Sequence, residues 1–253
     1  MYKDINFRTD LASERKEIYK NANKVEGTID GIECRKEEIN EKLKVEKVKI
    51  TNEKGEKAIG KPIGTYITID TKDLKLATDE DIDIASKVLT KELKNLIDTH
   101  IQSQDEILVV GLGNIYVTPD SLGPKVINEI DVTRHLMKYM PKYLEEGTRM
   151  VSAISPGVLG TTGIETVEII KGIVDNIKPK LVIVIDALAS RSIERISSTV
   201  QLSDTGIIPG GGVGNSRSEI SKNTLGIPVI SLRYSNSSWN SSTSKWLFRF
   251  IYK

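Results

Sequence analysis

The sequence predicts an α/β fold in which a mainly parallel sheet is covered by helices on both faces, so that the molecule has three layers. Short continuous apolar runs, typical of strands buried on both faces, alternate with amphipathic helical stretches after about residue 79. Before that point apolar and polar residues alternate, which indicates strands with one solvated face. Because no repeat or linker interrupts the chain, we expect one domain that includes an N-terminal β-rich part.

The individual elements follow from these patterns. Residues 1–20 are polar and mixed in charge, so a mobile arm is expected there. Helices are expected at 79–101 and 165–177, where apolar residues have helical spacing and, in the first case, an acidic start suits a helix N-terminus. Alternating or continuous apolar residues predict strands at 45–50, 64–69, 107–111, 149–154, 181–185 and 227–232.

Composition limits the classes of function. The chain has 36 Lys+Arg against 35 Asp+Glu and a net charge of +1, so there is no electrostatic case for direct nucleic-acid binding. No apolar run approaches the roughly 18 residues that a membrane span requires, and the first residues do not resemble a secretory signal. We therefore expect a cytoplasmic protein without a membrane partner.

The histidines and the cysteine give little support for metal or thiol chemistry. His100 and His135 are far apart in the sequence, and neither belongs to an HExxH pattern. Cys34 is the single cysteine and lies in a charged stretch unlike a nucleophile turn. We expect no cofactor and no metal, although a metal held by carboxylates and one histidine stays open.

Two carboxylates follow predicted buried strands. Asp186 comes directly after 181–185, and Asp120 lies in the long polar turn after 107–111. Ligands bind outside the carboxyl ends of strands in open α/β sheets, so both are candidates for catalysis. The alternative for each is a helix N-cap, which spacing alone favours for Asp120.

A third candidate segment, 204–215, is rich in glycine. Its backbone suits close approach of an extended peptide, an oxyanion or a phosphate, and a plain flexible loop is equally compatible. The Gly-Lys-[Ser/Thr] of a phosphate loop is absent, and a dinucleotide motif starting at Gly111 fails at Tyr116. The residues that would contact a substrate here are Gly210, Gly211, Gly212, Gly214 and Asn215.

Several longer motifs occur along the chain in a characteristic order. They are Phe7-Arg-Thr-Asp-Leu-Ala12, Thr118-Pro-Asp-Ser-Leu-Gly-Pro124, Val132-Thr-Arg-His-Leu136, the Ser155–Thr166 segment, Asp186-Ala-Leu-Ala189 and the 204–215 loop. Together and in this order they resemble the motifs of the germination protease family of spore-forming Firmicutes, and a clostridial source is expected. The resemblance covers roughly residues 7–232.

The resemblance implies an endopeptidase with a fold related to hydrogenase maturation endopeptidases. The two catalytic aspartates of the family match Asp120 and Asp186. A carboxylate pair of this kind shares a proton, so that one member deprotonates water while the other acts as an acid. Two readings stay open beside this one: a metal-assisted maturation-type endopeptidase, and a non-catalytic ligand-binding α/β module.

The resemblance also implies a zymogen that acts as a homotetramer in the forespore and spore core. Its substrates are small acid-soluble spore proteins, cut after Glu and before an apolar residue followed by Ala-Ser-Glu. Asp10-Leu-Ala-Ser-Glu14 nearly copies that site, so we expect self-cleavage between Asp10 and Leu11, with 1–10 as propeptide and 11–232 as peptidase domain. An acidic residue before the scissile bond suggests a basic subsite, for which the candidates are Arg134, Arg191 and Arg217.

Residues 233–253 depart from the family and are expected to be an aberrant tail. They are rich in Ser and Asn, and no helix or strand is expected to continue into them. Codons available to this segment, read one base later, encode Gly-Ile-Pro-Thr-Val-Val, which resembles the segment that the family has here. We therefore expect a reading-frame slip with early termination, and a product that is unstable or inactive because apolar surface is exposed.

Overall fold

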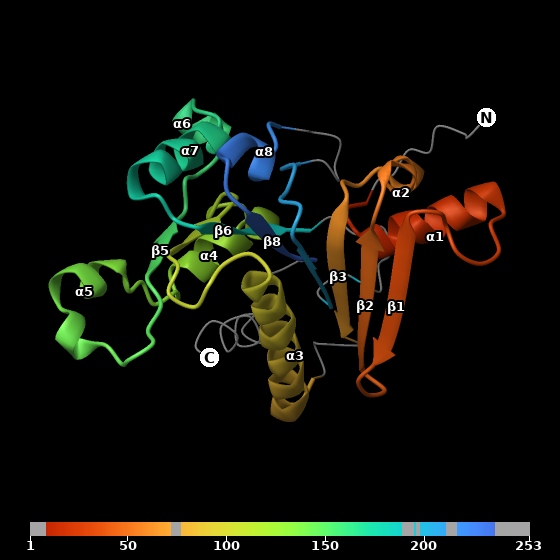
Figure 1. The fold of residues 1–253 in the computed structure, drawn as a ribbon, viewed down its shortest axis with the longest axis horizontal. Coiled ribbons are helices and arrows are strands. Elements are labelled where there is room, and N and C mark those ends of the chain that lie inside the picture. The colour runs from red at the N-terminus through yellow and green to blue at the C-terminus, as the bar shows by residue number, and fades with distance from the viewer. Residues whose placement is uncertain (1–8, 72–76, 189–194, 196–197, 211–216, 236–253) are drawn as a thin grey trace.

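The computed structural model describes residues 9–71, 77–188, 195, 198–210 and 217–235. Its centre is an eight-stranded mixed sheet with the strand order β1-β2-β3-β7-β8-β6-β4-β5 (Figure 1). The strands are β1 (Ile32–Glu38), β2 (Leu43–Ile50), β3 (Gly64–Thr71), β4 (Ile107–Gly111), β5 (Val151–Ile154), β6 (Leu181–Ala187), β7 (Thr199–Ser203) and β8 (Val229–Tyr234).

The sheet consists of a parallel half and an antiparallel half. Strands β5, β4, β6 and β8 pair in parallel, whereas β1, β2, β3, β7 and β8 pair in antiparallel fashion. The prediction of a mainly parallel sheet is therefore wrong. Apolar runs report burial on both faces and carry no information on direction, and β7, whose polar residues alternate with Val200 and Leu202, was missed.

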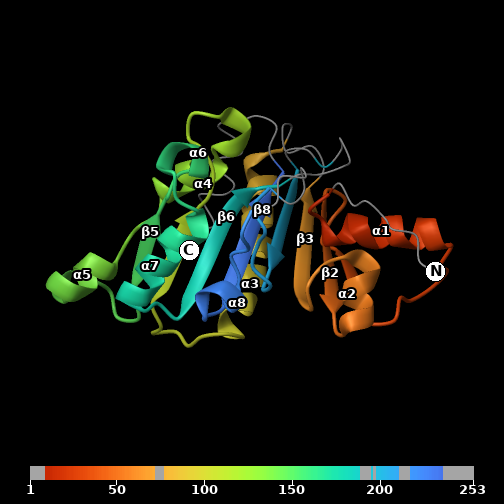
Figure 2. The ribbon, with the colours of Figure 1, turned by 90° about the horizontal axis from the view of Figure 1, so that it is seen from above.

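Helices cover both faces of the sheet, so the three-layer α/β architecture is confirmed (Figure 2). On one face, the long helix α3 (Asp79–Asp98) and α4 (Leu122–Ile127) pack on the central strands. The opposite face carries two separate groups of helices. These are α7 (Thr166–Ile177) with α8 (Lys222–Leu225), and α1 (Ala12–Asn23) with α2 (Glu53–Ile59).

The shorter helical segments lie in the connections of the parallel half. They are α5 (Arg134–Tyr139), α6 (Leu159–Thr162) and the 3-10 turns η2 (Thr118–Asp120) and η3 (Pro141–Tyr143). No helix within the described ranges is long and apolar enough to cross a membrane.

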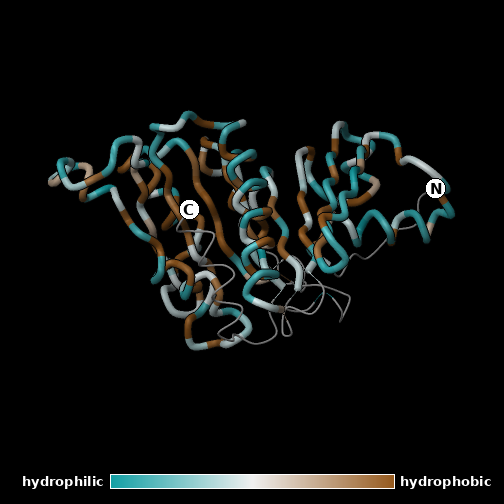
Figure 3. The backbone as a smooth tube through the Cα atoms, turned by 90° about the horizontal axis from the view of Figure 1, so that it is seen from below, coloured by the Kyte–Doolittle hydropathy of each residue, from teal (hydrophilic) through white to brown (hydrophobic). Residues whose placement is uncertain are grey.

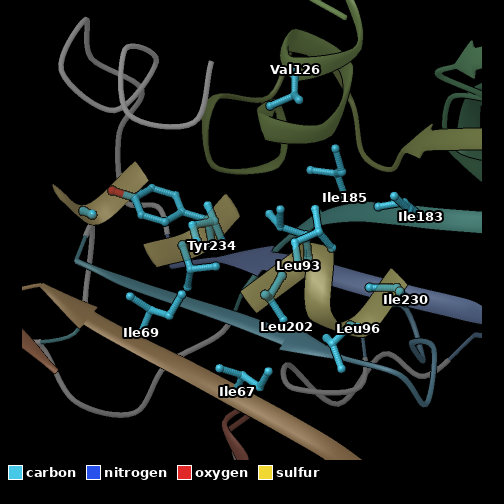
Figure 4. Packing of buried hydrophobic residues seen from close by; sticks show 14 of the residues in the cluster. Ile67, Ile69, Leu93, Leu96, Val126, Ile183, Ile185, Leu202, Ile230 and Tyr234 are labelled. Atoms are coloured by element: carbon cyan, nitrogen blue, oxygen red, sulfur yellow. The ribbon is translucent and has the colours of Figure 1, made fainter. Parts of the chain in front are cut away.

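The largest core cluster lies between α3 and the sheet. Leu93 and Leu96 of α3 meet residues from strands of both halves, among them Ile69 and Ile183 (Figure 4). Burying such a side chain stabilises the fold by about 1.5–3 kcal/mol. Hydrophobic residues accordingly concentrate on the central strands, whereas α1 is largely hydrophilic (Figure 3). One core therefore spans both halves of the sheet, which is why the β-rich part is not a separate unit.

Two predictions at the ends of the chain are wrong. Residues 12–20 belong to α1, and Leu11 and Ala12 are fully buried, so this stretch is no mobile arm. Strand β8 continues to Tyr234, two residues beyond the expected end, and Ser235 N donates to Thr199 O at 2.9 Å. The remaining parts of the expected arm and tail, 1–8 and 236–253, lie outside the described residues.

Candidate active site

Asp186 lies near the carboxyl end of β6, where the apolar run ends. Its side chain points to the face that carries α1, α2, α7 and α8, because Val182 and Val184 of the same strand pack there. Asp186 is only 8% exposed, and its Oδ2 is 3.5 Å from a guanidinium nitrogen of Arg233. Burial raises the pKa of Asp186 to about 6; Arg233 opposes the shift, and Asp120 and Asp10 add to it.

Asp120 is held in a tight turn at the same edge of the sheet. The backbone N–H of Asn114 donates to Asp120 Oδ2 at 2.9 Å, and Asp120 N donates to Val117 O at 2.8 Å. Gly113 has φ +115°, and a Cβ there would lie 2.0 Å from the Asp120 carbonyl oxygen. Only glycine therefore permits this close approach between the two ends of the loop after β4.

The N-cap alternative for Asp120 is not what the structure contains. Asp120 belongs to the 3-10 turn η2, and α4 begins at Leu122 with Ser121 at its cap position. The Asp120 carboxylate instead accepts the Asn114 amide within its own loop. The Asp120 side chain therefore does not cap a helix, and its charge acts on Asp186.

The two aspartates share one electrostatic environment. Strands β4 and β6 are parallel neighbours, and Leu112 N donates to Ile185 O at 2.8 Å, which fixes the loop after β4 against the end of β6. The charge of Asp120 raises the pKa of Asp186. Burial also raises the pKa of Asp120, and Arg217 lowers it. Two nearby carboxyls with raised pKa values can divide the roles of acid and base.

Arg233 was missed by sequence reasoning, which assigned it to the aberrant tail. It pairs with Asp186 in the β6–β8 register, is 5% exposed, and donates to Asp10 Oδ2 at 2.7 Å and to Ala187 O at 3.2 Å. The strand was expected to end at Leu232, and the Ser- and Asn-rich residues after Arg233 gave no sign that the strand continues through it. Its role becomes visible only when β8 is placed between β6 and β7.

The expected cleavage site is buried beside Asp186. Asp10 is 3% exposed and Leu11 is 0% exposed. The amide side chain of Gln201 in β7 binds the backbone on both sides of Leu11: its Nε2 donates to Asp10 O at 3.2 Å, and its Oε1 accepts from Ala12 N at 2.9 Å. Arg195 donates to Ser13 Oγ at 2.8 Å. Side chains of β7 and Arg195 therefore hold the segment around the Asp10–Leu11 bond in the way that a bound peptide would be held.

The predicted basic residues have different surroundings. Arg134 pairs with Glu106 at 2.5 Å, at the amino end of β4 and hence the opposite edge from Asp120. Arg217 lies within electrostatic reach of Asp120. Arg191 lies outside the described residues, as do Gly211, Gly212, Gly214 and Asn215 of the glycine loop. Gly210 is described and has φ +72°.

Within the described ranges, no group of three or more His, Cys, Asp or Glu side chains is arranged to hold a metal ion. The site brings together two carboxyls, the guanidinium of Arg233 and the backbone groups of the loop after β4.

Comparisons with known proteins agree on one family. A family model described as germination protease matches residues 9–243, which extends beyond Leu232, where the resemblance was expected to stop. The germination protease of Caldanaerobacter subterraneus subsp. tengcongensis is 52% identical over 230 residues, 90% of this chain and 68% of that protein. That of Clostridium acetobutylicum is 51% identical over 226 residues, 89% and 68% of the two chains. One from Clostridium perfringens is 52% identical over 227 residues, 90% and 69%.

Proposed function

Because the chain belongs to the germination protease family, we propose that it is a spore-germination endopeptidase in which Asp120 and Asp186 form the catalytic pair. The observation that carries the assignment is the electrostatic coupling of the two carboxyls at the shared carboxyl edge of β4 and β6. Family membership supports the protease activity, and the electrostatic coupling supports the choice of Asp120 and Asp186 as the catalytic residues.

In the proposed mechanism Asp186 is the acid and Asp120 is the base. The more deeply buried Asp186, with a pKa of about 6, retains a proton more readily than Asp120, which accepts an amide hydrogen bond and lies near Arg217. Asp120 takes a proton from water as the water oxygen attacks the scissile carbonyl carbon. Asp186 gives its proton to the departing amide nitrogen as the C–N bond breaks, leaving a carboxylic acid and an amine.

We further propose that the chain is a zymogen cut between Asp10 and Leu11. Supporting this, Asp10 interacts electrostatically with Asp186, and Gln201 binds the backbone around the bond. Residues 1–10 would then be the propeptide, and the peptidase domain, expected to span 11–232, would include β8 to its end at Tyr234. Because Asp10 and Leu11 are both almost fully buried, a second enzyme could not reach the bond, and this supports cleavage by the molecule's own aspartates.

The substrates that we propose are small acid-soluble spore proteins, cut after an acidic residue in the forespore and spore core. A homotetramer, no direct binding to nucleic acid, and a fold relation to hydrogenase maturation endopeptidases belong to the same proposal. The reading-frame slip expected at Arg233 is a separate hypothesis, and the place of Arg233 and Tyr234 inside the buried strand β8 argues against it. Re-sequencing of the gene tests it: an intact frame in the genomic DNA rejects it.

The deciding experiment uses a peptide that contains Glu-Ile-Ala-Ser-Glu. We expect cleavage after the first Glu, and a loss of about 10²–10⁴-fold in kcat for Asp120→Asn and for Asp186→Asn. Asp131→Asn, at an exposed position, is the matched control and keeps its activity. Full activity in both active-site variants would reject the aspartate pair, and loss of wild-type activity on chelation would favour the metal-assisted alternative. Absence of any proteolysis with both aspartates intact would favour a ligand-binding module.

A further inference from the structure

A polar pocket of ≈ 170 Å³ lies beside the proposed catalytic pair. It opens on the face of the sheet between the helices α1 and α2 and the helix α8, where β7 and β8 carry polar side chains. Its walls include three basic residues and two acidic ones: Arg15, Lys61, Arg233, Asp10 and Glu219.

The basic residues in the pocket are held in place by uncharged groups as well as by Asp10. Arg15 donates from Nη1 to Gly60 O at 2.7 Å and from Nε to Thr9 O at 2.9 Å. Lys61 Nζ lies 5.6 Å from the ring centre of Tyr66. These contacts position the cations without supplying a counter-charge, so the electrostatic balance of the pocket depends on carboxylates.

Two observations indicate that the positive charge of the pocket depends on Asp10 for compensation. The Nε of buried Arg233 has no hydrogen-bond partner in the part of the chain that the structure describes. Burial, together with the charges of Arg15 and Arg233, lowers the pKa of Lys61 to about 7, and only Asp10 acts in the other direction. If Asp10 left, Arg15 and Lys61 would lose the carboxylate whose charge favours their protonated forms, and Arg233 would keep Asp186 at 3.5 Å. Glu219, the other acidic residue of the pocket wall, already accepts from Ser221 Oγ at 2.8 Å.

We propose that this pocket is a carboxylate-binding subsite for an acidic side chain of a bound peptide, and that Asp10 fills it in the uncleaved chain. Gln201 argues for a peptide over a free anion, because its amide binds backbone groups on both sides of Leu11. Arg233 joins the subsite to the reacting groups, since one guanidinium nitrogen contacts Asp10 and Asp186. The statement that the bound peptide is a substrate rests on the proposed function. The statement that the pocket binds a carboxylate is independent of it.

The subsite can be tested by adding a small carboxylate, acetate, that binds in place of the Asp10 side chain. Asp10→Ala removes the internal carboxylate, and acetate should replace it. At acetate concentrations ten times its dissociation constant, we expect the Tm of Asp10→Ala to rise by about 3–6 °C over the same concentration of chloride. Wild type and the isosteric Asp10→Asn, in which the site stays filled, should not respond. Asp10→Ala/Lys61→Met should lose the response.

The possible outcomes separate the subsite from the activity. A folded Asp10→Ala that responds equally to acetate and chloride, or to neither, overturns the proposal; Asp10→Ser repeats the measurement with a smaller change of volume. In a second assay, wild type should prefer Glu over Gln before the scissile bond, and Lys61→Met should reduce that ratio of kcat/KM about tenfold or more. An unchanged ratio overturns the subsite. An acetate response without cleavage of either peptide would reject the proposed function and retain the subsite.

Discussion

At the scale of single residues, the site depends on charges that are buried and must compensate one another. Asp186 has a pKa of about 6 in the folded protein against 3.8 when unperturbed. Because the folded state binds the proton more tightly, the contribution of Asp186 to stability is most favourable at low pH. It declines as pH rises from about 4 to about 6 and is constant above that range.

The Asp186→Asn substitution removes the loss of stability that wild type undergoes as pH rises through this range. At about 1.4 kcal/mol per pKa unit, the free energy of unfolding of the variant relative to wild type should increase by roughly 2–3 kcal/mol between pH 4 and pH 7. Urea unfolding at the two pH values measures the change. Asp131→Asn, at an exposed position, should show no such difference. A constant difference between variant and wild type across this range would contradict the raised pKa.

Arg233→Met has the opposite consequence, because it leaves Asp10 and Asp186 buried without their shared cation. We expect a loss of about 3–5 kcal/mol at pH 7. The loss should shrink toward pH 4.5, where Asp186 can take up a proton. Asp10→Asn in the same background should recover part of it. A small, pH-independent loss in urea unfolding would show that Arg233 contributes only packing.

At the scale of elements, the loop between β4 and α4 determines the position of Asp120. Its backbone approaches the Asp120 carbonyl at Gly113, where a side chain has no room. The elements on either side are rigid: β4 is buried along its whole length, and α4 packs on the core. Small changes in the loop therefore act on Asp120 and leave the framework in place.

Gly113→Ala should lower kcat/KM by at least about tenfold, because the added Cβ displaces Asp120, and should destabilise the fold by more than about 1 kcal/mol, since φ is positive. The control is Gly172→Ala in α7, where a Cβ meets nothing within 4 Å and helix propensity improves by up to about 1 kcal/mol. Peptide cleavage and urea unfolding report the two effects. Normal activity in Gly113→Ala would show that the loop is not rigid.

The elements also show what the sequence could and could not reveal. The apolar runs that formed β4 and β6 predicted that Asp120 and Asp186 would lie at one edge, because adjacent parallel strands end together. The sequence pattern does not indicate helix α1, because the helix is highly charged and only a few of its residues, such as Ala12 and Tyr19, pack on the sheet. Arg15 and Lys61 form a pocket through contacts between distant segments, which no local pattern encodes.

At the scale of the whole molecule, β7 joins the two halves of the sheet. It pairs with β3 on one side and with β8 on the other, and one core cluster extends from Val45 in β2 to Ile183 in β6. The N-terminal hairpin, which sequence patterns set apart, therefore shares its stability with the strands that carry the aspartates.

Ile50→Ala in β2 tests this unity. Ile50 is 1% exposed, so the loss should be about 2–5 kcal/mol. If the sheet unfolds as one unit, hydrogen exchange of the slowest amides of β6 should accelerate by the same free energy as that of β2. Ile39→Ala, at an exposed site, should change neither. Acceleration confined to β1–β3 would show two independent units.

The polar row across the sheet has one more consequence. Thr68, Gln201, Arg233 and Asp186 are successive partners on four adjacent strands, all on the same face. A slip of β8 by a single residue would turn Arg233 toward the hydrophobic face beneath α3 and bring a leucine or tyrosine beside Asp186. Such misalignment would strand a guanidinium in hydrocarbon, a far larger penalty than any loss of packing. The charges of the proposed site would therefore also favour the correct alignment of the strands during folding.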